Sequence, residues 1–220
     1  VLFYSHDTYG LGHIQRTLNI ARQLAHDAPQ VSMLMVTGSQ FSNALAMPTQ
    51  LDFMKLPSIV KDPDGAYRAH VSSLALQDLV TMRDNMLFET VHRYAPDVIL
   101  VDKAPAGVHG ELVRTFNHVK SARPETKIVL GMRDIEDDAA ETRAAWTKQR
   151  IYPLLERVYD SILLYGSRSL YDPVREYGLS NRIAAKITEC GHVAKSEPTV
   201  AAHDLRAALK MKTNRLVVVT

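Results

Sequence analysis

The chain has 220 residues, 46% of them hydrophobic, which is enough for one large α/β domain or for one domain and the start of another. Its 26 basic and 24 acidic residues give a formal net charge of +2. Such a balance does not indicate a nucleic-acid-binding surface and allows only weak, peripheral contact with an anionic membrane face. The single Cys190 excludes an intramolecular disulfide framework, and no apolar run approaches the roughly 20 residues of a membrane span, so we expect a cytoplasmic protein.

Apolar runs alternate with helix-like segments along the chain. This alternation is typical of a parallel sheet that is covered by helices on both faces, and several runs are continuously apolar, as buried parallel strands are. The sequence therefore predicts an α/β fold with a Rossmann-like parallel sheet. The predicted strands are residues 1–5, 31–37, 52–56, 98–101, 127–132, 161–165 and a short run at 186–190.

Two helices are predicted in the first half of the chain. Between the first two strands, Ile14, Leu18 and Ala25 recur at helical spacing and give one apolar face that can lie on the sheet. A longer helical tract is predicted from residue 67 to residue 94, and Pro96 ends it.

The other predicted features are a loop and a divided helix. Residues 61–65, with the sequence KDPDG, are rich in turn formers and predict an exposed loop. A further helix should start within residues 134–138, because acidic side chains suit a helix N-terminus. Pro153 should kink or divide that helix.

The opening of the chain predicts a strand, a glycine turn and a helix. Gly10 and Gly12 allow a sharp turn, and with Leu11 they bring backbone N–H groups to the positive end of the helix dipole, a geometry that suits a phosphate. His13 and Arg16 lie one turn apart and can face the same crevice. The dipole favours a neutral imidazole at His13, which is the state that a general base requires.

Five other polar residues are candidates for the same crevice. Asp102 ends a strand that faces it, and its carboxylate could orient His13, bind an acceptor hydroxyl or only cap the next loop. Arg133 and Asp134 close the next strand and are candidates of the same kind. His6 and Asp7 lie in the turn itself, where they could bind a sugar or stabilise the turn.

Several common phosphate-binding or hydrolytic motifs are missing. Gln15 stands where a dinucleotide-binding turn has its third glycine, and the second strand ends in residues 37–39, Thr-Gly-Ser, without the acidic residue that would hold a ribose. The chain has no Gly-Lys-Ser/Thr triplet and no Gly-x-Ser-x-Gly elbow. These absences disfavour a dinucleotide-dependent enzyme, a Walker-type nucleoside triphosphatase and a serine hydrolase.

Two segments resemble a known enzyme family. Residues 4–18, YSHDTYGLGHIQRTL, are similar to the Gly-x-Gly-His-x-x-Arg opening of bacterial glycosyltransferases of family 28, which include the lipid-II-forming N-acetylglucosaminyltransferase. Residues 95–102, APDVILVD, with the following PAG at 105–107 and EL at 111–112, are similar to that family's fourth strand and its loop. The resemblance extends in element order to about Val193.

The resemblance implies a fold and a division of labour. Enzymes of this kind have the GT-B architecture, in which two Rossmann-like domains face each other across a cleft, the amino-terminal one binding the acceptor and the other most of the nucleotide-sugar donor, with no essential metal and no cofactor. Gly10 and Gly12 match the loop glycines and Arg16 matches the motif arginine. His13 matches the motif histidine, the candidate base or transition-state hydrogen-bond donor.

The end of the chain predicts a domain boundary. A polar stretch near Ser196 is followed by a short helical segment and then by residues 216–220, LVVVT, which are typical of the first strand of a new sheet. We therefore expect residues 1–195 to form the acceptor-side domain. Residues 196–220 would be a linker and the start of a second domain, and a chain ending here should be inactive alone.

Three functions fit these features. The first is transfer of a hexose-type sugar from a nucleotide diphosphate sugar, with UDP expected as the nucleotide, to an acceptor hydroxyl, by an inverting and metal-independent reaction. The second is hydrolysis of a UDP-sugar, since hydrolases similar to an enzyme of the pseudaminic acid pathway open with the same Gly-x-Gly-His-x-x-Arg pattern. The third is a module that binds a nucleotide sugar without turning it over. The sequence does not indicate an oligomeric state.

Overall fold

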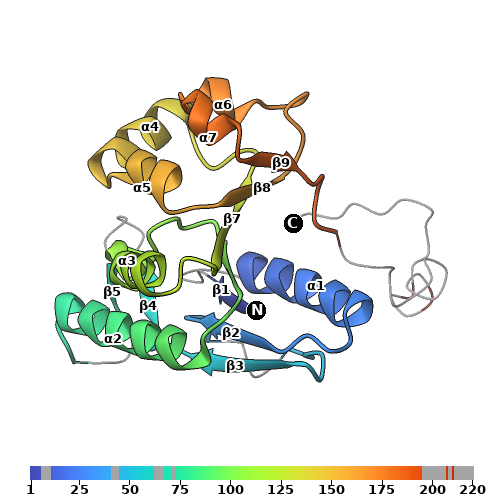
Figure 1. The fold of residues 1–220 in the computed structure, drawn as a ribbon, viewed down its shortest axis with the longest axis vertical. Helices are drawn as coiled ribbons and strands as arrows, with labels where there is room; N and C mark the ends of the chain where they lie inside the picture. Colours follow the sequence, from blue (N-terminus) through green and yellow to red (C-terminus); the bar gives the residue numbers. More distant parts are fainter. Residues whose placement is uncertain are drawn as a thin grey trace.

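A computed structural model describes residues 1–5, 11–40, 45–61, 67–70, 73–194, 207 and 210, and its main element is a seven-stranded parallel sheet (Figure 1). All seven predicted strands are present, each within two residues of its predicted bounds. The α/β, Rossmann-like class is therefore confirmed. In sheet order, the strands are β3 (Leu51–Lys55), β2 (Met33–Thr37), β1 (Leu2–Ser5), β6 (Val98–Asp102), β7 (Lys127–Arg133), β8 (Ser161–Tyr165) and β9 (Ile187–Glu189).

The order in which strands are added to the sheet reverses beside β1. The chain first adds β2 and β3 on one side of β1 and then returns to place β6 on the other side. In open parallel sheets the loops that leave two such neighbouring strands run to opposite faces, and the crevice between them is the usual ligand site. The last residues of the two strands, Ser5 and Asp102, are paired in register, so Asp102 lies at the position where such a crevice is expected.

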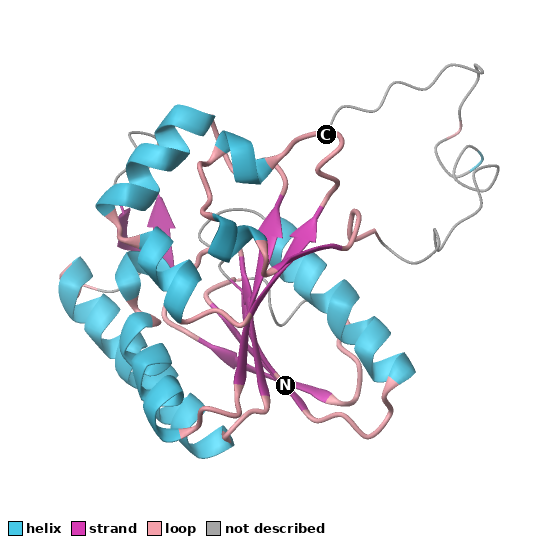
Figure 2. Ribbon diagram, turned by 45° about the horizontal axis from the view of Figure 1, so that its top comes forward, coloured by secondary structure: helices cyan, strands magenta, loops and turns pink. Residues whose placement is uncertain are grey.

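Helices cover both faces of the sheet, as Figure 2 shows. Phe3 packs on one face with Ile14 and Leu18 of the first helix, whereas its neighbours Leu2 and Tyr4 belong to a larger core on the other face. The alternation along β1 is what buries the strand on both sides. The helices are α1 (Gly12–Asp27), α2 (Leu76–Tyr94), α3 (Val113–Ala122), α4 (Ala139–Lys148), α5 (Ile151–Arg157), α6 (Pro173–Glu176) and α7 (Asn181–Ala184), with a 3₁₀ turn, η2 (Val108–Gly110).

The prediction of one helix over residues 67–94 is wrong in its first part. Residues Tyr67–Ala69 form a short strand, β5, which pairs antiparallel with β4 (Ile59–Lys61). Helix α2 begins only at Leu76, and it ends at Tyr94 as predicted. The error arose because β5 has only three residues and is stabilised by pairing with a strand earlier in the chain. Of the predicted loop at 61–65, residues 62–65 lie outside the described residues.

The predicted helix start near residue 138 is confirmed, and the predicted break at Pro153 is displaced. The Asp138 carboxylate accepts hydrogen bonds from the backbone N–H groups of Ala140 (2.8 Å) and Glu141 (3.1 Å) and so caps α4. The helical tract is interrupted at Arg150, between α4 and α5, where the backbone takes a left-handed φ of 54°. Pro153 lies in the first turn of α5, where a missing N–H costs nothing.

A buried ion pair fixes the loop that follows β6. Arg83 of α2 donates from Nε to Glu111 Oε2 (2.6 Å) and from Nη2 to Oε1 (2.7 Å), and the Tyr4 hydroxyl donates to Oε1 (2.5 Å). Both charged side chains are almost fully buried, at 3% and 0% exposed. Glu111 therefore joins α2 and β1 to the loop that carries it.

Replacing Glu111 with alanine should lower the free energy of unfolding by about 3–5 kcal/mol, because the Arg83 charge would stay buried without its partner. Urea denaturation measures this change. The control is Glu89→Ala, which removes the exposed partner of Arg93 on the same helix α2 and should cost less than about 1 kcal/mol. Equal effects of the two substitutions would show that the Arg83–Glu111 pair does not stabilise the fold.

The described part of the chain contains no helix with the length and apolar character to cross a membrane. The predicted second domain cannot be compared with the structure. Of residues 196–220, only Ala207 and Lys210 are described. The boundary near Ser196 stays a prediction.

Candidate functional site

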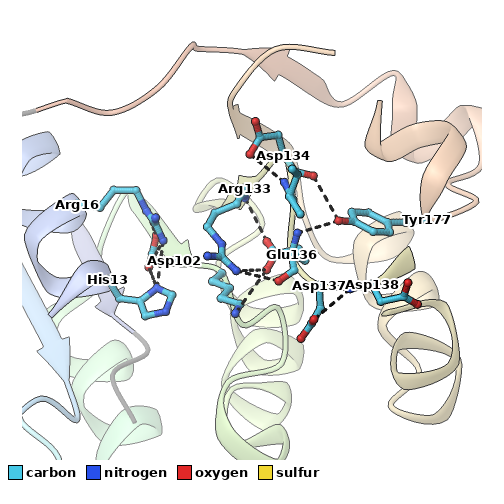
Figure 3. Close-up of polar contacts among 11 residues, drawn as sticks. His13, Arg16, Asp102, Arg133, Asp134, Glu136, Asp137, Asp138 and Tyr177 are labelled. Carbon is cyan, nitrogen blue, oxygen red and sulfur yellow. Dashed lines mark hydrogen bonds and ion pairs between the residues drawn. The ribbon is translucent and has the colours of Figure 1, made fainter. Parts of the chain in front are cut away.

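His13, Arg16 and Asp102 meet at the carboxyl edge of the sheet, where β1 and β6 end (Figure 3). His13 Nδ1 lies 2.6 Å from Asp102 Oδ2. Arg16 donates two hydrogen bonds to the same carboxylate, from Nε to Oδ1 (2.8 Å) and from Nη2 to Oδ2 (2.9 Å). The contact between α1 and β6 joins residues that are 89 positions apart in the sequence, His13 and Asp102.

Helix α1 positions the two basic side chains. It begins at Gly12, so His13 lies in its first turn and Arg16 follows three residues later on the same side of the helix, as predicted. The Asp102 side chain is only 5% exposed, and those of His13 and Arg16 are 17% and 16% exposed. Arg16 is therefore part of the site and not a solvated surface residue.

The protonation state of Asp102 decides the tautomer of His13. Burial by itself would raise the pKa of the Asp102 carboxyl, but hydrogen bonds from His13 and Arg16 outweigh burial and hold the pKa below its ordinary value. An ionised carboxylate only accepts hydrogen bonds, so Nδ1 of His13 must carry the proton that it shares with Asp102. The other ring nitrogen, Nε2, is then the basic one.

Arg16 contributes charge and position and does not hydrogen-bond the imidazole. Its Nη2 lies 3.1 Å from His13 Nδ1, but two N–H groups cannot donate to each other, and Nη2 donates to Asp102 Oδ2. Burial would lower the pKa of Arg16, and the hydrogen bond to Asp102 more than compensates, so the guanidinium stays charged. Arg16 thus fixes the carboxylate that orients His13. Among the roles predicted for Asp102, the geometry favours orientation of His13.

Among the described residues, no atom lies within 4 Å of a Cβ atom added to Gly12, so their packing leaves room for a side chain at the start of α1. Leu11 is the N-cap residue and its side chain forms no capping hydrogen bond, and no acidic residue lies in the first turn of α1. Leu11 therefore leaves the positive end of this helix without a capping charge, which is consistent with a predicted phosphate site.

Gly12→Ala should keep the fold and weaken ligand binding. Alanine is the better helix former, so the melting temperature should stay the same or rise. A methyl group at the first residue of α1 should weaken binding of UDP by about tenfold or more, measured by isothermal titration. Unchanged UDP affinity in the folded variant would show that this space is not the phosphate site.

The remaining predicted residues have other positions. His6, Asp7 and Gly10 lie outside the described residues. Arg133 is turned toward the loop after β7, where its Nη2 donates to the backbone carbonyl of Glu136 (2.9 Å). Asp134 accepts a hydrogen bond from the backbone N–H of Ile135, and Figure 3 shows both side chains apart from the His13–Asp102 pair.

Two residues near the site were not predicted. Tyr165, at the end of β8, lies with its ring 5.4 Å from the Arg16 guanidinium carbon, and burial raises the pKa of its phenol, which stays neutral. Its ring occupies the space that a side chain at Gly131 would fill. The glycine within the apolar run of β7 was the signal for this close approach. The second unpredicted residue is Glu136, and no pattern in the sequence indicates that it lies near the site.

The site combines an Arg16–Asp102 ion pair, a histidine and a helix N-terminus. Within the described residues, no three or more His, Cys, Asp or Glu side chains are grouped so that they could hold a metal ion. His13, held by Asp102, can transfer a proton, and the N-terminus of α1 beside it is a structure that can bind an anion.

Solved glycosyltransferase structures share this fold. The chain superposes on a UGT transferase from Siraitia grosvenorii in complex with UDP with a TM-score of 0.53 and 12% identity, over 95% of this chain and 54% of that one. UDP-glucose:anthocyanidin 3-O-glucosyltransferase in complex with UDP gives a TM-score of 0.53 and 12% identity, over 96% and 57%. Anabaena HepE in complex with UDP-glucose gives 0.51 and 15%, over 95% and 49%.

The chain thus spans about half the length of these solved structures, and at such low identity the likeness is one of fold. No protein-family model matches the sequence, and comparison with curated proteins finds no match. The resemblance to family 28 stays a prediction.

Proposed function

We propose that this chain is the acceptor-side part of a glycosyltransferase that moves a sugar from a nucleotide diphosphate sugar to an acceptor hydroxyl. The observation that carries the proposal is the 2.6 Å contact between His13 and Asp102 at the point where the sheet reverses. The fold shared with transferases solved in complex with UDP or UDP-glucose supports the reaction class and a UDP-linked donor.

In the proposed reaction, Nε2 of His13 removes the proton from the acceptor hydroxyl as its oxygen attacks the anomeric carbon of the sugar. The bond from that carbon to the diphosphate oxygen breaks, and its electron pair leaves with the nucleoside diphosphate. Asp102 stabilises the imidazolium that forms at His13, and Arg16 keeps the carboxylate in place. A single displacement of this kind inverts the anomeric configuration, and no step requires a metal.

The Gly12 end of α1 has a proposed role at the leaving group. Backbone N–H groups and the positive helix end would stabilise charge that develops on the diphosphate. The greater part of the donor site would belong to a second domain, in the half of the matched structures that this chain does not span.

Product release with and without an acceptor tests the proposal. The intact protein is incubated with UDP-glucose, UDP-galactose or UDP-N-acetylglucosamine, and UDP and free sugar are quantified. A transferase should release UDP faster when a hydroxyl acceptor is added and should form a glycoside of inverted configuration. Release of equal amounts of UDP and free sugar without an acceptor would instead establish a hydrolase, and UDP binding without turnover would establish a binding module.

A further inference from the structure

A groove runs along the loop that follows β6, and two of the residues that line it, Lys103 and Glu136, are close enough to Asp102 to interact with it electrostatically. Its first hollow, of about 330 Å³, is lined by Lys103, Glu136 and Trp146, and Lys103 is the residue directly after Asp102. A second hollow, of about 540 Å³, is lined by Tyr67 and by the loop through His109. Ala104 and Gln149 line both hollows, so the two adjoin along this groove, and each has the size of a small-molecule site.

The walls of this groove alternate small residues with hydrogen-bonding ones. Ala104 and Ala145 leave room, whereas Lys103, Glu136 and Gln149 offer donors and acceptors. A flat apolar ligand would remove these charged groups from water without replacing their hydrogen bonds. A ligand rich in hydroxyl groups would replace them.

Both hollows have an aromatic residue in their lining. Trp146 lines the first hollow, and contacts with the rings of Tyr152 and Tyr177 behind it, at centroid distances of 5.8 and 5.5 Å, hold its ring in place. Tyr67 and His109 form an edge-to-face pair with centroids 5.1 Å apart in the second hollow. Such rings supply rigid apolar contacts between polar ones, which suits the alternating apolar and hydroxyl surface of a sugar ring.

The charged end of the groove has unused hydrogen-bonding capacity. Lys103 Nζ and Arg133 Nη2 lie 3.8 and 3.7 Å from Glu136 Oε2, which are ion-pair distances too long for hydrogen bonds. A ligand hydroxyl could bridge the ammonium and the carboxylate. Thr142 also lines this hollow, and among the described residues its Oγ1 is one of the buried polar atoms without a hydrogen-bond partner.

We propose that this groove binds the acceptor and that the acceptor is an extended carbohydrate, with the reacting hydroxyl beside Lys103 and further sugar units along the loop toward His109. The inference rests on the proposed function, because it uses His13 as the base next to the groove. The two adjoining hollows make the site long enough for more than one sugar unit. Their mixed polar and aromatic lining matches the surface of a carbohydrate.

Trisaccharide binding to the intact protein tests the inference. Maltotriose, cellotriose and chitotriose, their monosaccharides and the flat flavonoid quercetin are the probes, in saturation-transfer NMR and isothermal titration. We expect at least one trisaccharide to bind at least about tenfold more tightly than its monosaccharide. Quercetin binding alone, or no binding of any trisaccharide, would overturn the inference.

A matched pair of variants places the binding in the groove. Ala145 lines the first hollow and Ala144, its neighbour on α4, is exposed and does not. Ala145→Trp should weaken trisaccharide binding at least about tenfold and Ala144→Trp less than about twofold. Glu136→Gln, which keeps the side-chain shape, should weaken it about tenfold and serves if Ala145→Trp does not fold. Wild-type affinity in both groove variants would contradict the groove.

Turnover separates this inference from the proposed function. If the trisaccharide binds in the groove but no sugar is transferred to it from any of the three UDP-sugars, the proposed function fails and the binding site stands. If transfer occurs with an acceptor KM that Ala145→Trp leaves unchanged, the groove is wrong and the function stands.

Discussion

His13→Ala is expected to lower the kcat of acceptor-dependent sugar transfer by about 10²–10⁴-fold, which is the usual contribution of a positioned general base. The variant should fold normally, because His13 is partly exposed and its removal opens no cavity in the core. UDP release with a saturating acceptor measures the effect. Binding of UDP, measured separately, should change by less than about threefold, because the imidazole is needed for proton transfer.

The matched control is His26→Ala. His26 lies on the same helix α1, and its side chain is 82% exposed, so its removal should leave kcat within about twofold of the wild type. If His13→Ala retained full turnover while folded, the assignment of His13 as the base would be rejected, whatever the overall reaction proved to be.

Asp102→Asn is expected to be nearly as damaging, although it changes one atom. In Ser-His-Asp sites the corresponding substitution costs about 10⁴-fold because it favours the wrong histidine tautomer, and we expect a fall in kcat of about 10²–10⁴-fold here. Arg16 would bind the amide oxygen as a donor. The amide NH₂ would then face Nδ1 of His13 and force the proton onto Nε2, where the base is needed.

Asp97→Asn controls for the loss of a negative charge. Asp97 is exposed and directly precedes β6, at the opposite end of the strand that Asp102 ends, so its substitution should leave kcat within about twofold of the wild type. Steady-state kinetics and thermal unfolding of both variants provide the comparison. A normal kcat in a folded Asp102→Asn protein would show that the carboxylate does not set the tautomer.

The sheet was predictable because a strand that is buried on both faces is apolar at consecutive positions, a pattern visible in the strand's own sequence. Strands such as β6 and β8 are short, continuously apolar runs that can be recognised without knowing their neighbours. The first turn of α1 was predictable for a similar reason, since the glycines and the 13–16 spacing are local. The short strand β5 was missed because three residues carry too weak a pattern, and its pairing with β4 depends on contacts across a turn.

The site was predictable only in part. The sequence placed His13 and Asp102 at the same edge of the sheet but left the role of Asp102 open among three possibilities. The 2.6 Å contact, which joins two separate elements, favours one of them. Glu136 comes near the site only through the packing of loops and strands that are distant in sequence, so its type and spacing did not indicate a role, and for Tyr165 the one local signal was Gly131 in the facing strand.

The ¹⁵N chemical shifts of the His13 ring test the central claim most directly. In the ¹⁵N-labelled protein, at a pH at which the His13 ring is neutral, the account predicts that Nδ1 carries the proton and that Nε2 has the shift of an unprotonated nitrogen, with the assignment reversed in Asp102→Asn. A wild-type ring with its proton on Nε2 and a bare Nδ1 would contradict the account, because His13 could not then accept a proton from an acceptor hydroxyl.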